Sequence, residues 1–209
     1  RGSLVIPDTV TQLESNAFSY CSSITNFVLS KKITEVSRYV FSYCSKILNL
    51  TIPDWVTSIG SYSFAHCSGI RGTLTIPDSV TEWITSIGSY AFSYCSGITS
   101  LNLSKNLARI ESYVFSNCNG IVRLNIPETI TYIGSYAFSS CSGIRGILTI
   151  PDSVKTIDRF AFSHCSGFNS LQLGKGVTTI NENVFEYCSS LATLNLPETV
   201  TSIGAYALS

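Results

Sequence analysis

The chain has 209 residues, 13 of them basic and 13 acidic, so its formal net charge is zero. A neutral chain lacks the long-range field that attracts nucleic acids or anionic membranes, which argues against both as partners. The sequence has no run of 18 apolar residues, so we expect no membrane insertion in this segment.

The first predicted element is a short β-strand that starts near Leu4. Apolar and polar residues alternate there, which predicts a strand with one buried face. Pro7 then ends the strand, because proline has no N–H to give to a central ladder. The same alternation returns along the chain, for example at 101–103 and 148–150.

The segment between strands reads "SIGSYAFSYCSG" at 86–97, with close copies elsewhere. Its serines and glycines favour turns, and only a brief helical spacing of apolar residues is present. We predict a turn followed by one turn of helix, of the 3₁₀ type.

The eight cysteines recur at spacings of 23, 23, 28, 23, 23, 24 and 23 residues, and a period in the twenties is the signature of a solenoid. A phenylalanine stands three residues before every cysteine, and an aliphatic residue stands eight before. One unit buries little alone, so we expect stacked units, about nine of them, to share one core. The cysteines are Cys21, Cys44, Cys67, Cys95, Cys118, Cys141, Cys165 and Cys188.

The period breaks in two ways. One extra residue falls within "RGTL" (71–74) and within "RGIL" (145–148), and four more lie around "EWIT" (82–85). Both kinds of break leave the strand and the Phe-x-x-Cys word intact, so we predict that they are loop insertions.

A second period spans three of these units. The residue after each strand-ending position runs acidic, basic, acidic in every three units, as in Asp8, Lys31 and Asp54. The chain is therefore predicted to be a single solenoid domain over 1–209, in three-unit blocks near 4–73, 74–147 and 148–209. No capping unit is visible at either end, so we expect a fragment of a longer protein.

The same charge order has a physical reading. Stacked strands lie about 4.8 Å apart, so a column of carboxylates would repel itself and a lysine between them relieves this. We interpret the order as a register and solubility device in preference to a binding stripe.

Three roles for the cysteines compete. Disulfides are possible in a secreted chain, but ladder side chains point the same way and stay too far apart for a bridge. A zinc site needs cysteines two to four residues apart, and none here are closer than 23. We favour the third role, a column of buried thiols that fill space and donate weak hydrogen bonds to loop carbonyls.

The repeated words resemble the BspA-like class of leucine-rich repeats. The match lies in "IPDSV…SIGSYAFSYCSGI" (76–98) and its copies, which cover essentially the whole chain. The resemblance implies an α/β solenoid arc, with a parallel sheet of short strands on its concave face and turns with short 3₁₀ helices on the convex side. It also implies a surface or secreted protein, because repeats of this class occur in such proteins of anaerobes and mucosal parasites, where they are linked to adhesion.

The search for catalytic residues returns none. His66 and His164 occupy the position before the cysteine, where other units carry Tyr, Asn or Ser, so we interpret it as a tolerant surface position. Phosphate-binding and dinucleotide-binding glycine motifs do not occur. We predict that the chain is not an enzyme and uses no cofactor or metal.

Candidate binding residues come from the outward strand positions and from two tryptophans. The strand positions form nearly uncharged columns that could hydrogen-bond an extended partner, or could be a solvated β-surface. Recurrent tyrosines near the cysteine form a stripe that either covers the core or holds sugars or protein. The predicted partner-binding residues are Trp83, Trp55, Asn102, Asn125, Arg123, Thr149 and Gln172.

Two functions follow from the sequence. The first is an adhesin-like, non-enzymatic recognition module of a surface or secreted protein. It would bind a host extracellular or cell-surface protein, or a glycan, and would work outside the cell. The second is a structural spacer with no ligand of its own. The insertion at 82–85 favours the first, because an insertion on one unit often marks a site.

Overall fold

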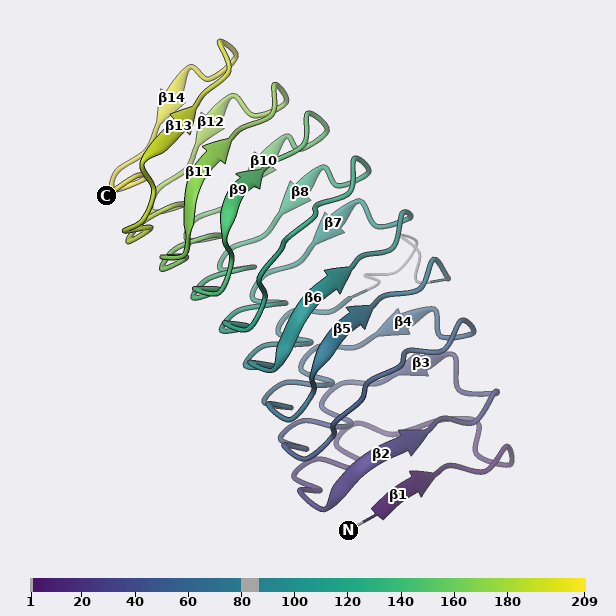
Figure 1. The fold of residues 1–209 in the computed structure, drawn as a ribbon. Helices are drawn as coiled ribbons and strands as arrows, with labels where there is room; N and C mark the ends of the chain where they lie inside the picture. Colours follow the sequence, from purple (N-terminus) through teal and green to yellow (C-terminus); the bar gives the residue numbers. More distant parts are fainter. Residues whose placement is uncertain (1, 80–86) are drawn as a thin grey trace.

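A computed structural model describes residues 2–79 and 87–209. The chain winds into a long stack of coils, with the two termini at opposite ends of the stack (Figure 1). Every strand pair is parallel, and each partner lies one coil away. The predicted parallel solenoid is therefore confirmed.

Each coil passes through a long-strand position and then a short-strand position. The long strands are β1 (Gly2–Val5), β2 (Ile24–Val28), β5 (Gly72–Thr75), β6 (Ile98–Asn102), β9 (Gly146–Thr149), β11 (Phe168–Gln172) and β13 (Thr193–Asn195). The short strands are β3 (Glu35–Val36), β4 (Ser58–Ile59), β7 (Arg109–Ile110), β8 (Tyr132–Ile133), β10 (Thr156–Ile157), β12 (Thr179–Ile180) and β14 (Ser202–Ile203). The sequence predicted the long strands only, because two residues are too few to show alternation.

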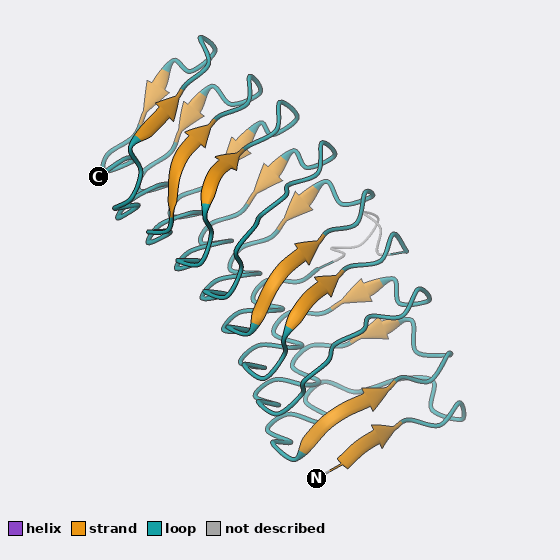
Figure 2. Cartoon of the chain, viewed as in Figure 1, coloured by secondary structure: helices purple, strands orange, loops and turns teal. Residues whose placement is uncertain are grey.

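The predicted 3₁₀ helix is wrong: the described residues contain strands and turns but no helix (Figure 2). Within each Phe-x-x-Cys turn only alternate N–H groups bond inside the coil. Ser116 donates to the carbonyl of Tyr113 (3.2 Å), whereas Phe115 donates to Ala137 of the next coil (2.9 Å). Tyr113 and Asn117 also have left-handed φ angles of 63° and 60°, which a continuous helix does not tolerate.

The estimate of nine repeats also needs correction, because the chain makes about 8 turns. Eight Phe-x-x-Cys words are present. The ninth strand position, β13, is followed by β14, and Ser209 comes before the position where a ninth cysteine would stand. The ninth unit is therefore a partial coil.

The segments "RGTL" and "RGIL", which hold the single extra residues, run from the preceding turn into long strands, with Gly72 beginning β5 and Gly146 beginning β9. The pairing register shifts by one residue between Gly72 and Thr73 on β5, and beside Gly146 on β9. Both glycines have left-handed φ angles, 79° and 74°. At each shift the two-residue step lies on the partner strand, from Ile98 to Ser100 on β6 and from Phe168 to Ser170 on β11, as in a β-bulge. The glycines opposite adopt a backbone conformation that other residues rarely take. The insertion at 82–85 lies outside the described residues.

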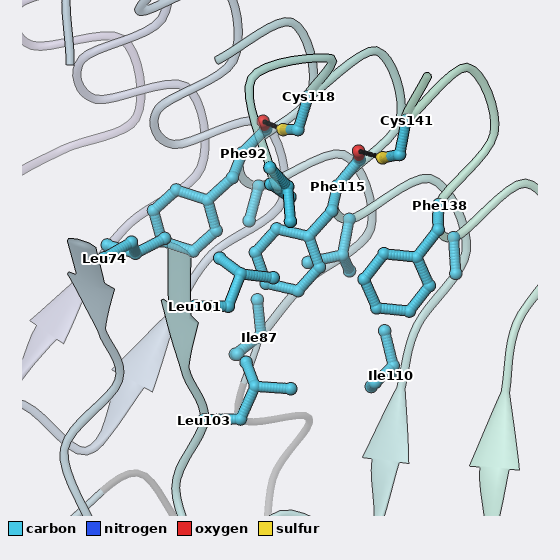
Figure 3. Packing of buried hydrophobic residues seen from close by; sticks show 14 of the residues in the cluster. Leu74, Ile87, Phe92, Leu101, Leu103, Ile110, Phe115, Cys118, Phe138 and Cys141 are labelled. Atoms are coloured by element: carbon cyan, nitrogen blue, oxygen red, sulfur yellow. Dashed lines mark hydrogen bonds between the residues drawn. The ribbon is translucent and has the colours of Figure 1, made fainter. Parts of the chain in front are cut away.

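The core is one continuous file of phenylalanine rings between the two rows of strands. Consecutive rings from Phe18 to Phe185 lie with centroids 5.3–5.8 Å apart. Figure 3 shows Phe92, Phe115 and Phe138 in this file, with Leu74 and Leu101 beside it. Each ring is fully buried from Phe41 onward, so each coil is covered by the next.

The thiols form a second file at the rim of the core. Each Sγ from Cys44 to Cys188 donates to the carbonyl of the phenylalanine one coil earlier, at 3.0–3.3 Å, as Figure 3 shows for Cys118 and Cys141. All eight cysteines are free, and the prediction of buried thiols holds for the seven from Cys44 to Cys188, whereas Cys21 is half-buried. Burial raises the pKa of Cys44 to about 11 and that of Cys118 to about 12.

The thiol file predicts alkaline instability. A thiol whose pKa rises from 9.0 to about 12 on folding stabilises the fold fully below pH 9, and this contribution is lost as pH rises toward 12. Each thiol steepens the loss by up to about 1.4 kcal/mol per pH unit. Urea denaturation between pH 8 and pH 11 should show a shallower loss for Cys118→Ala than for the wild type. Identical slopes would contradict the role of the buried thiol.

Ser63 offers a test of the core chemistry. Its hydroxyl is fully buried and has no hydrogen-bond partner among the described residues, at a position where Ala91 and Ala137 stand in other coils. Ser63→Ala should raise the free energy of unfolding by about 1–2 kcal/mol, because an unpaired buried hydroxyl is lost. The matched control is Ser139→Ala, which removes a buried hydroxyl bonded to Ser163 (3.0 Å) and should lower stability. Equal effects of the two variants on the urea midpoint would refute this reasoning.

Candidate partner-binding surface

The outward side chains of the long strands form a face that we call the long-strand face. Strand pairing places Thr75 opposite Asn102 and Thr149 opposite Gln172. All four side chains are exposed, so three of the predicted partner-binding residues, Asn102, Thr149 and Gln172, do lie on this surface. Their amides and hydroxyls can donate and accept hydrogen bonds without any net charge.

Two further predicted residues lie on the same face in a coil that has no long strand. Arg123 forms an isolated parallel bridge with Ser100 of β6, and Asn125 follows two residues later. Both are exposed. The face also carries exposed apolar side chains, with Val5 at 65% and Ile147 at 63% exposure. The long-strand face therefore carries both apolar and amide side chains, together with one arginine, Arg123.

Two hollows open where the long strands meet the loops that follow them. The first hollow has a volume of about 690 Å³ and the second about 410 Å³. Both are lined by equivalent residues of successive blocks. In the first these include Thr75, Asp78, Asn102 and Lys105, and in the second Thr149, Asp152, Gln172 and Lys175. The hollows are thus a repeated feature of the stack, three coils apart.

The aspartates of these loops stabilise the register through the backbone. The carboxylates of Asp8, Asp78 and Asp152 accept the backbone N–H of the lysine one coil on, at 3.0, 2.9 and 2.8 Å. The two ion pairs among the described residues lie elsewhere, at Arg109–Glu111 and Arg159–Glu182. The three aspartates therefore support the stacking register through bonds that peptide N–H groups donate to their carboxylates.

Of the two predicted tryptophans, Trp55 lies within the described residues. Trp55 is 36% exposed, and its Nε1 donates to the carbonyl of Ser30 in the previous coil (3.2 Å). This bond ties the ring to the preceding coil, and Trp55 is not among the residues that line the first hollow, although its neighbour Asp54 is. Trp83 lies outside the described residues, so its position stays a prediction.

A cluster on the short strands was not predicted. Tyr132 donates to Asp158 (2.5 Å), and the guanidinium of Arg109 lies 3.8 Å from the centre of the Tyr132 ring. Burial, followed by the bond to Asp158, raises the pKa of Tyr132 to about 12. The sequence signal that could have revealed this cluster is the residue before the isoleucine of the short strand. That residue is Ser or Thr in most units, but it is Arg109 and Tyr132 in two successive units.

The family model for the BspA type leucine rich repeat region matches residues 2–86 and 85–209 of the chain, in six copies. The chain belongs to the BspA-type leucine-rich-repeat family. Solved structures agree with this assignment. A leucine-rich repeat protein from T. pallidum matches with a TM-score of 0.71 and 29% identity, over 81% of this chain and 77% of that one.

Two other solved structures extend over nearly the whole chain. A leucine rich cell surface protein from Faecalibacterium prausnitzii matches with a TM-score of 0.61 and 25% identity, over 99% of this chain and 70% of that one. A leucine-rich repeat protein from Bacteroides ovatus matches with a TM-score of 0.66 and 24% identity, over 99% of this chain. The chain spans 63% of that protein's length. No curated protein sequence matches.

Among the described residues, no helix of this BspA-type repeat chain could cross a membrane. The stack presents three exposed regions. These are the long-strand face, the loops that follow it, and the turns at the other edge of the stack (Figure 1).

The aspartate bonds give a prediction with an internal control. Asp152→Ala should lower the free energy of unfolding by about 0.5–1.5 kcal/mol, because the exposed N–H of Lys175 exchanges a carboxylate acceptor for water. Glu128→Ala changes an exposed carboxylate of the same hollow and should stay within about 0.5 kcal/mol of the wild type. Denaturant titration measures both, and a larger loss for Glu128→Ala would refute the register role of Asp152.

Proposed function

We propose that this chain is a non-enzymatic recognition module that binds an extended segment of a partner protein along the long-strand face. The observation that carries the proposal is the repetition of one hollow at equivalent positions of two blocks. The hollows are about 14 Å apart along the stack, three strand spacings of about 4.8 Å. An extended chain that runs along the stack advances about 3.4 Å per residue, so it would place every fourth residue in a hollow.

The chemistry of the two hollows favours this kind of ligand. Each presents a hydroxyl and an amide from paired long strands, next to a carboxylate whose lone pairs are partly used by the backbone. Such groups bond peptide N–H and C=O groups along an extended chain. Trp55, which follows the hollow-lining residue Asp54 in the sequence, and Trp83 would supply aromatic anchors of the kind that dominate interfaces.

The setting that we propose is a cell-surface or secreted protein with an adhesin-like role toward a host extracellular or cell-surface protein. Support comes from the family and from the Faecalibacterium prausnitzii structure, which is described as a cell surface protein. A glycan could use the same hydroxyls and amides, and it is the alternative ligand on this face. A spacer without a ligand is the second candidate function, favoured by the uncharged and regular strand columns.

The test uses substitutions that block both hollows. The blocked variant carries Asn102→Arg and Gln172→Arg, which place long side chains at the outward ends of β6 and β11. Wild type and variant are applied to arrays of purified extracellular-matrix proteins and of glycans, and bound chain is quantified. We expect retention on a protein and at least a tenfold loss for the blocked variant.

The control variant carries Thr156→Arg and Thr179→Arg on the short strands, with the same added charge. It should bind as the wild type does. Retention on glycans alone would replace the protein partner by a sugar. No retention of the wild type on either array would leave the spacer function.

A further inference from the structure

The turn edge of the stack carries two columns of stacked rings outside the core. The first column occupies the position five residues before the cysteine. It is unbroken over six successive rings, whose centroids lie 4.2–4.7 Å apart. Its members are Tyr39, Tyr62, Tyr90, Tyr113, Tyr136 and Phe160. The second column stands directly before the cysteine, and it is interrupted.

The interruption of the second column is two coils long. Rings stack from Tyr20 through Tyr43 and His66 to Tyr94 at 4.2–4.6 Å, and again from His164 to Tyr187 at 4.7 Å. Between them the same position holds Asn117 and Ser140. Tyr94 and His164 therefore each present one ring face that no ring of this column covers.

The backbone carries on through the interruption without change. Tyr94, Asn117, Ser140 and His164 have φ angles of 59°, 60°, 60° and 58°. The N–H groups of Tyr94, Asn117 and Ser140 each donate to the next coil at 2.8 Å. The four side chains thus start from the same geometry, and the rings of Tyr94 and His164 are about 14 Å apart, three steps of about 4.8 Å.

The first column shows what fits in such a space. Over the same two coils it holds Tyr113 and Tyr136, stacked between Tyr90 and Phe160 at steps of 4.2, 4.6 and 4.6 Å. Two flat rings therefore match the interval between Tyr94 and His164. Access is open, because Tyr94 is 47% exposed and His164 is also exposed.

The floor of the interruption is polar and small. Asn117 is held to one side, since its Nδ2 donates to the hydroxyl of Ser116 (2.9 Å), and its amide oxygen remains an acceptor. Ser140 adds a hydroxyl, and both residues are half-exposed. A ring that carries an N–H or O–H group can stack on Tyr94 or His164 and donate to this floor.

We infer that the interruption between Tyr94 and His164 is a binding site for flat aromatic rings, in particular indole and phenol groups. The ligand completes the column that Asn117 and Ser140 leave open. The site lies on the turn edge and does not depend on the long-strand face. Its test is therefore independent of the test of the proposed function.

The experiment uses indole as the probe, with binding measured by saturation-transfer NMR and titration. The filled variant, Asn117→Tyr with Ser140→Tyr, supplies the two missing rings from the chain itself. Tyr43 and Tyr94 already occupy equivalent positions with the same backbone, so the variant is compatible with the fold. We expect the wild type to bind indole and the filled variant to bind it at least tenfold more weakly.

A matched pair tests one wall of the site. Tyr94→Ser removes the ring face that the ligand contacts and should weaken binding about two- to tenfold. Tyr20→Ser makes the same change at the far end of the column, where the ring is 70% exposed, and should stay within twofold of the wild type. Undiminished binding by the filled variant, or equal losses for Tyr20→Ser and Tyr94→Ser, would overturn the inference. If the filled variant does not fold, this pair decides alone.

Discussion

The structure depends on one constraint, the backbone hydrogen bonds that run from each coil to the next. They hold the strands in parallel register, and they also run through the Phe-x-x-Cys turns, where alternate N–H groups donate to the following coil at 2.6–3.2 Å. Because every coil is held at the same spacing from its neighbours, equal positions in the sequence become columns in space. The phenylalanine file, the thiol file and the outer tyrosine columns are all consequences of this register.

The same constraint explains the residue types. A column of identical side chains must tolerate its own copies at strand spacing, which excludes unrelieved charges and favours rings, thiols and amides. The thiol suits the rim of the core because it is small and can still donate to the carbonyl of the previous coil, as Cys118 does to Phe92. The aspartate of the loop solves the equivalent problem outside the core by accepting a peptide N–H of the next coil.

Much of the fold could be predicted because the repeat multiplies a weak signal. The long strands, the buried Phe-x-x-Cys word and the free thiols all follow from columns that recur in every coil. The 3₁₀ helix could not be predicted correctly, since the partners of Phe115 and Asn117 lie in the next coil and no local pattern shows them. The register shift beside Gly72 was likewise hidden, because it depends on how β6 in the next coil pairs with β5.

The candidate surfaces divide in the same way. Asn102, Thr149 and Gln172 were found by alternation, since outward strand positions are readable from period two. The Arg109–Tyr132–Asp158 cluster joins residues of three coils. Arg109 and Tyr132 occupy a position that is often serine or threonine, and Asp158 occupies one that is often glycine, so only a comparison of the units at the short strands could reveal the cluster. The open stretch at Asn117 and Ser140 has meaning only once the neighbouring rings are known to stack.

The register claim is tested most directly by amide hydrogen exchange within one turn, followed by NMR. If the N–H groups of Tyr113, Phe115 and Asn117 bond to the next coil, they should exchange only with the opening of adjacent coils, near the free energy of global unfolding. Exchange of these three amides at rates close to those of an unstructured chain would contradict the coil-to-coil ladder.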